Sequence, residues 1–141
     1  MKDRFLIFAV SALIILWVYT AGSKVLEFQE FRHQLKLQHF NIYLIPLLSI
    51  LLPLSEALIA FLLSHSNSRR LGLYTSLFFL ASFTIYIILI LSGFFEKIPC
   101  SCGGVLKELG WTAHLIFNSS FLSLNLWAIY YIKRKERRSG K

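Results

Sequence analysis

The chain alternates between long apolar runs and short polar connections. Four apolar runs cover residues 5–22, 42–63, 71–95 and 111–132 of the 141 residues. A run of about 18 or more apolar residues is long enough to cross the roughly 30 Å hydrocarbon core of a bilayer as an α-helix. The pattern therefore predicts an all-α protein: a four-helix transmembrane bundle in the lipid bilayer, with residues 1–141 forming a single integral membrane domain.

The connection between the first and second runs carries a pattern of its own. Phe28, Phe31 and Leu35 recur at three- and four-residue spacing, and charged residues stand between them. This spacing is typical of an amphipathic helix. We expect this helix to lie in the membrane interface or to cap the bundle.

The charges predict the orientation of the four spans. The net charge is +8, and ten of the fifteen Lys and Arg residues fall on the side of the two termini. Basic residues collect on the cytoplasmic side of a membrane protein. We therefore expect a bacterial inner-membrane protein with a cytoplasmic N-terminus, a cytoplasmic C-terminus and a basic cytoplasmic tail at 133–141. Membrane topology accounts for the positive charge, so we do not expect a nucleic-acid partner.

The first apolar run has a second reading. It follows a basic start and ends in small residues at Thr20, Ala21 and Gly22, as a secretory signal peptide would. Cleavage there would leave three spans. Because the run reaches spanning length, we favour a retained first helix.

The only two cysteines lie close together in the connection between the third and fourth runs. Cys100 and Cys102 are separated by one residue and flanked by Pro99, Gly103 and Gly104, which favour a tight turn. On the outer side of the membrane, disulfides persist. A small strained ring favours a redox pair over a structural bond. There are two alternatives. The first is a metal site in which His114 and either His33 or His39 join the two cysteines, and the second is an inert cysteine pair.

Polar residues also occur inside the spans. His114, Asn118 and Asn125 share one helix face. Glu56, deep in the second run, shares a face with Ser49, Pro53 and Ala60. An intramembrane carboxylate indicates a functional site. Glu56 and Asn125 lie at similar depth, which predicts that they pair.

Each of these polar groups has two interpretations. Glu56 either handles protons or contacts a quinone, or it forms a buried structural hydrogen bond beside Pro53. His114 either assists a thiolate or relays a proton, or it is an interfacial residue that is hydrogen-bonded to water.

Three motifs resemble a known family. They are Thr20-Ala21-Gly22-Ser23-Lys24, Leu52-Pro53-Leu54-Ser55-Glu56 and the Cys100-Ser101-Cys102-Gly103 loop before the fourth span. Together with four spans they resemble the MauE (methylamine utilisation) branch of the DoxX-like membrane proteins. The resemblance implies a thioredoxin-like periplasmic partner and a role in maturation of the disulfide-rich methylamine dehydrogenase.

The residues favour a membrane component of periplasmic thiol–disulfide exchange. Cys100, Cys102 and His114 are the candidate catalytic residues. Glu56, Asn118 and Asn125 are the candidate contacts for a quinone that accepts the electrons. Whether the chain is itself an enzyme stays open. The rival interpretations are a non-catalytic assembly factor or anchor for a periplasmic partner and a small metal carrier or transporter.

Overall fold

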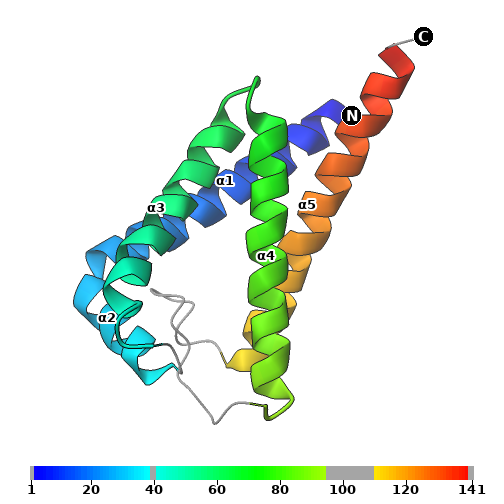
Figure 1. Ribbon diagram of the computed structural model, residues 1–141. Helices are drawn as coiled ribbons and strands as arrows, with labels where there is room; N and C mark the ends of the chain where they lie inside the picture. Colours follow the sequence, from blue (N-terminus) through cyan, green and yellow to red (C-terminus); the bar gives the residue numbers. More distant parts are fainter. Residues whose placement is uncertain (1, 39–40, 95–109, 140–141) are drawn as a thin grey trace.

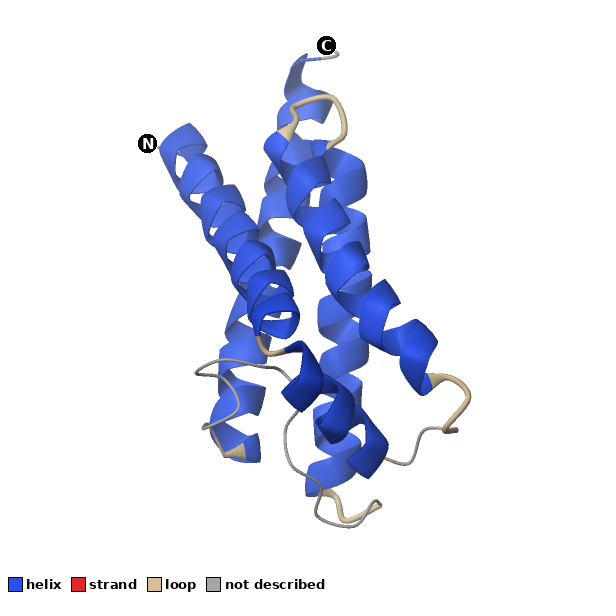
Figure 2. Ribbon diagram, turned by 90° about the vertical axis from the view of Figure 1, so that its left-hand side faces the viewer, coloured by secondary structure: helices blue, strands red, loops and turns tan. Residues whose placement is uncertain are grey.

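The protein is a bundle of helices, seen here in a computed structural model that describes residues 2–38, 41–94 and 110–139. Within these ranges the chain forms α1 (Lys2–Leu26), α2 (Phe28–Leu37), α3 (Ile45–Ser64), α4 (Arg69–Leu91) and α5 (Trp111–Ser139), with no strand among them. Figures 1 and 2 show the bundle from two directions. The predicted all-α, four-helix architecture is confirmed.

Four of the helices are long and apolar enough to cross a membrane. They are α1, α3, α4 and α5, and the shorter α2 lies between the first two. A spanning segment must satisfy its backbone hydrogen bonds internally, which a continuous helix does. The chain is a multi-pass membrane protein.

The four long helices pack as a closed ring of neighbours. α1 packs against α3, and α4 packs against α5; α3 against α4 and α1 against α5 complete the ring. α1 runs obliquely across the bundle, whereas α3 and α4 form a hairpin (Figure 1). α3 and α5 are therefore diagonal to each other.

The two ends of the bundle differ. One end, which we term the termini end, holds the start of α1, the turn between α3 and α4 and the end of α5 (Figure 1). The other, termed the α2 end, holds α2, the end of α4 and the start of α5. This grouping matches the predicted order of crossings.

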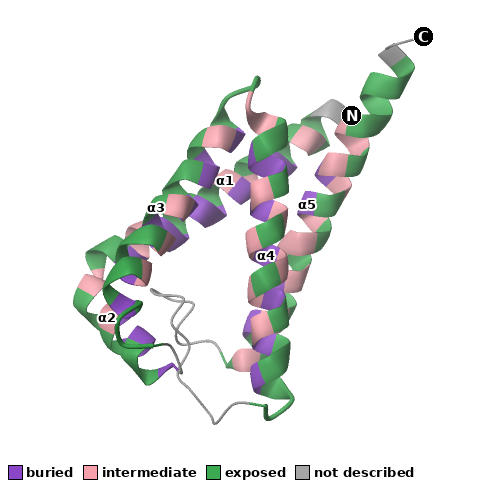
Figure 3. Cartoon of the chain, in the orientation of Figure 1, coloured by how far each residue is buried: buried purple, intermediate pink, exposed green. Residues whose placement is uncertain are grey.

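The core follows one face of each spanning helix (Figure 3). Leu13, Trp17, Leu63, Leu73 and Ala128 belong to its main buried cluster. Large apolar side chains on the opposite faces are exposed, as in Ile15, Leu54, Phe78 and Ile116. In a soluble protein such exposed apolar faces would favour aggregation, but in a membrane protein they suit contact with lipid.

The predicted amphipathic helix is present as α2. Its Phe31 and Leu35 are buried in a second cluster with Ile45 of α3, and Leu48 and Leu52 pack against that cluster. α2 also contacts α1. It therefore covers the α2 end on the side of α1 and α3.

Two helices extend beyond the apolar runs from which the spans are predicted. The first helix does not stop near Gly22 but continues to Leu26, which brings Lys24 into the bundle. The last helix does not stop near Ile132 but continues to Ser139, so most of the basic tail is helical. A hydropathy run ends at its first charged residues, but a helix can continue beyond them, as α1 and α5 do.

Candidate functional site: a cavity between the helix pairs

A cavity of about 280 Å³ lies between the α1–α3 pair and the α4–α5 pair, in the half of the bundle toward the α2 end. All five helices contribute to its lining. Most of the lining is apolar, including Leu16, Leu52, Phe83 and Phe117. Its volume is near the lower limit of typical ligand pockets, which are mostly apolar with a few placed polar groups.

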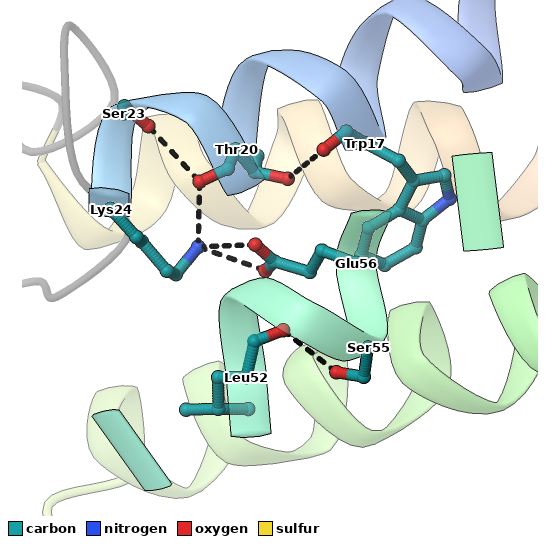
Figure 4. A network of polar contacts seen from close by, with 7 residues as sticks. All are labelled: Trp17, Thr20, Ser23, Lys24, Leu52, Ser55 and Glu56. Atoms are coloured by element: carbon teal, nitrogen blue, oxygen red, sulfur yellow. Dashed lines mark hydrogen bonds and ion pairs between the residues drawn. The ribbon is translucent and has the colours of Figure 1, made fainter. Parts of the chain in front are cut away.

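The wall made by α1 and α3 carries a buried ion pair (Figure 4). The Lys24 ammonium Nζ lies 2.8 Å from Glu56 Oε1 and 3.0 Å from Oε2, and the two side chains are 5% and 1% exposed. Nζ also donates to the Thr20 carbonyl oxygen at 3.3 Å. The Phe31 ring lies beneath the ammonium, with its centroid 5.7 Å away.

The predicted pairing of Glu56 with Asn125 is therefore wrong. Glu56 pairs with Lys24, because α3 packs against α1 and is diagonal to α5. Equal depth along two helices does not make their residues neighbours.

Asn125 instead joins three helices near the middle of the bundle. Its amide lies 2.8 Å from Ser76 Oγ of α4, and that oxygen accepts a hydrogen bond from Trp17 Nε1 of α1 at 2.9 Å. In the orientation that satisfies both ends of the amide, Asn125 also donates to the Leu73 carbonyl at 3.2 Å and accepts from the Leu77 amide at 3.0 Å. Asn125 is not among the residues that line the cavity described above, and its hydrogen bonds join α5 to α4.

Asn118 lies in the opposite wall of the cavity and hydrogen-bonds to α4. Its Nδ2 donates to the Leu80 carbonyl at 3.0 Å and to Thr84 Oγ1 at 2.7 Å, both on α4. The Thr84 hydroxyl in turn donates to the Leu80 carbonyl. Asn118 thus lines the cavity and fixes α5 against α4.

His114 lies one turn from the start of α5 and also lines the cavity. It is buried, with 4% of its surface exposed, and its ring is nearly parallel to that of Trp111, with centroids 6.5 Å apart. The predicted shared face of His114, Asn118 and Asn125 is confirmed, since all three are buried.

Cys100 and Cys102 lie outside the described residues. In sequence they stand between the end of α4 and the start of α5, two helix ends that meet at the α2 end. In the part of the chain that the structure describes, no group of three His, Cys, Asp or Glu residues could hold a metal ion. The alternative metal site included Cys100, Cys102 and His39, which are also outside that part.

The polar face of α3 is confirmed: Ser49, Pro53, Glu56 and Ala60 are all buried. Lys24 is the residue that sequence reasoning missed, because it was assigned to the connection after the first span. Its signal was present in the sequence. A lone carboxylate inside a span requires a cation, and Lys24 stands only two residues beyond the first apolar run.

Comparison with curated proteins finds no match, and comparison with solved structures finds none either. One family matches. The family described as methylamine utilisation protein MauE aligns with residues 2–131, from the start of α1 to the last turns of α5. This range includes the Lys24–Glu56 pair, the cavity lining and both cysteines. The chain therefore belongs to the MauE family.

Proposed function

We propose that the protein is a membrane component of thiol–disulfide exchange at the outer face of a bacterial inner membrane. In this proposal the α2 end faces the periplasm and both termini face the cytoplasm. The ten-to-five distribution of Lys and Arg supports this orientation. It puts Cys100 and Cys102 in a compartment where disulfides persist.

One observation carries the proposal. The segment that bears the cysteine pair joins α4 to α5 at the α2 end, and the first turns of α5 place His114 in the wall of an apolar cavity. Electron transfer from a redox pair to a lipid-soluble acceptor requires the two to come close, and Cys102 precedes the cavity-lining His114 by twelve residues in the sequence. Membership of the MauE family supports the same reading.

The exchange step starts from an oxidised Cys100–Cys102 pair. A thiolate of a thioredoxin-like partner attacks one of the two sulfurs, so that a mixed disulfide forms and the other sulfur leaves as a thiolate. The second thiol of the partner resolves the mixed disulfide. The partner leaves as a disulfide, and Cys100 and Cys102 remain as a dithiol with the two electrons and two protons.

Reoxidation of the dithiol needs an acceptor of two electrons, and the cavity fits a quinone. Its lining is mainly apolar, and its polar groups include Glu56 on one side and His114 and Asn118 on the other. A bound quinone supplies the capacity to take two electrons and two protons as the sulfur–sulfur bond forms again. His114, twelve residues after Cys102 in the sequence, is the candidate base that would take a proton from a thiol and favour the thiolate.

The experiment follows the thiols of reduced protein in lipid nanodiscs. Thiol labelling and mass measurement count free cysteines before and after addition of ubiquinone-1. We expect the wild-type protein to lose both thiols, whereas Cys102→Ser keeps its single thiol. In a graded redox buffer the pair should have a potential well above the roughly −300 mV that marks structural disulfides.

Two results would contradict the proposal. A pair that never oxidises, or that resists strong reductant, removes the exchange function and favours the non-catalytic assembly factor. If the pair cycles in the redox buffer but is not oxidised by quinone, the role of quinone as electron acceptor is excluded and thiol–disulfide exchange is kept.

Purified Cys102→Ser should also form a reductant-sensitive adduct through Cys100 with a thioredoxin-like protein, and Cys100→Ser/Cys102→Ser should form none.

A further inference from the structure

The buried ion pair between Lys24 and Glu56 needs an explanation beyond stability. Taking two charges out of water is costly, and a well-packed apolar pair of similar volume is often as stable or more so. Both residues line the cavity. Charged residues within a membrane usually mark a ligand or proton path.

The polar groups of the cavity are divided between two opposite walls. Thr20, Lys24 and Glu56 come from α1 and α3, whereas Ser82, Tyr86, His114 and Asn118 come from α4 and α5; Gln38, directly after α2, also lines the cavity. The remaining lining residues are mainly apolar. A flat ring with one carbonyl oxygen at each end, which is the chemistry of a quinone, suits this division.

The three N–H groups of the Lys24 ammonium are not equally held. Two of its hydrogen bonds go to the carboxylate at 2.8 and 3.0 Å, and the third goes to the Thr20 carbonyl at 3.3 Å. In a helix, the carbonyl of residue 20 also accepts from the backbone amide of residue 24. A ligand oxygen can therefore replace Thr20 as the third partner without leaving that carbonyl unsatisfied.

We propose that Lys24 is the hydrogen-bond donor for one carbonyl oxygen of the quinone, and that Glu56 is a positioning residue that holds the ammonium in the cavity wall. This inference rests on the proposed function. The Lys24 ammonium stabilises the negative charge that develops on that oxygen as electrons arrive from the dithiol. Glu56 holds the ammonium in the cavity wall through its two hydrogen bonds at 2.8 and 3.0 Å.

Intrinsic fluorescence measures binding apart from turnover. Trp17 and Trp111 line the cavity, whereas Trp127 packs on Phe5 and lines a separate pocket nearer the termini end. In a Trp127→Phe background, quenching by ubiquinone-1 reports the cavity. Trp17→Phe/Trp111→Phe, which keeps Trp127 alone, measures the quenching that arises from quinone dissolved in the lipid.

The decisive variant is Lys24→Met/Glu56→Met, which removes both charges at similar volume and leaves no unpaired ion. We expect its apparent Kd for ubiquinone-1 to rise at least about tenfold, the effect of losing a hydrogen bond from a charged donor. A soluble chemical oxidant should still oxidise its cysteines at the wild-type rate, and its unfolding midpoint should be close to wild type. Arg70→Met/Glu136→Met, which removes the exposed ion pair between α4 and α5, is the matched control and should leave the Kd unchanged.

An unchanged Kd in Lys24→Met/Glu56→Met overturns the inference while leaving quinone binding in place. Wild-type quenching no greater than that of the Trp127-only protein overturns the quinone arm of the proposed function and this inference with it. If the methionine variant does not fold, Lys24→Gln/Glu56→Gln replaces it, since it keeps a neutral hydrogen-bonded pair. A wild-type Kd in that folded protein overturns the role of the charge.

Discussion

Gly72 of α4 packs directly against the backbone of α3, which allows a sharp test of the packing. A Cβ atom built on Gly72 would lie 2.8 Å from the Leu63 backbone nitrogen, 3.0 Å from the Leu62 carbonyl carbon and 3.1 Å from Leu62 Cβ. Two of these three atoms belong to the backbone of α3 and cannot rotate away. Gly72→Ala therefore forces the two helices apart.

The size of the effect comes from two opposing terms. Alanine favours a helix over glycine by up to about 1 kcal/mol. Overpacking a well-packed interior costs about 1–3 kcal/mol, and rigid backbone neighbours place this site in the upper part of that range. We expect Gly72→Ala to lower the free energy of unfolding by about 1–2 kcal/mol.

Gly22 supplies the matched control. It lies in α1, and a Cβ atom there would have no neighbour within 4 Å. Gly22→Ala should then keep or raise stability, by up to about 1 kcal/mol. Unfolding by sodium dodecyl sulfate from mixed micelles, followed by circular dichroism, compares both variants with wild type. If Gly72→Ala is as stable as Gly22→Ala, the close approach of α3 and α4 is not as described.

Two further predictions concern the orientation and the polar core. Reporter fusions after Lys141 should read cytoplasmic and fusions at Lys107 periplasmic, because of the basic bias toward the termini end; a periplasmic C-terminus would contradict the four-span order. Asn125→Leu should lower the free energy of unfolding by about 0.6–2 kcal/mol, since it removes the link to Ser76 and the α4 backbone. The exposed Ser123→Leu on the same helix should change it by less than about 0.5 kcal/mol, and equal effects of the two would argue against the network.

The spans and their buried faces were predictable because the sequence patterns that mark them are local. A run of apolar residues is visible without knowledge of the fold, and residues at spacings of three and four share a face wherever the helix packs. The buried face of Ser49, Pro53 and Glu56 therefore follows from residue spacing alone, whatever the neighbours of α3 are.

The partners of the polar residues were not predictable in the same way. Depth along a helix follows from residue number, and it placed Glu56 level with Asn125. Which helices are adjacent depends on packing, which sets α3 beside α1 and diagonal to α5. Lys24 is not predictable as the partner of Glu56 for a related reason. Hydropathy treats a lysine as the end of a span, although its long side chain can reach a carboxylate inside the bundle.

The Lys24–Glu56 pair also bears on the order in which the helices enter the membrane. A charged side chain near the bilayer centre opposes insertion by about 2.5–3.5 kcal/mol on translocon scales, so α3 enters at a disadvantage when alone. α1 is synthesised first and carries the neutralising ammonium, so α1 and α3 enter most readily as one hairpin. α4 and α5 form a second hairpin, joined by the amides of Asn118 and Asn125. The cavity then lies where the two hairpins meet, so it forms only once they have packed together.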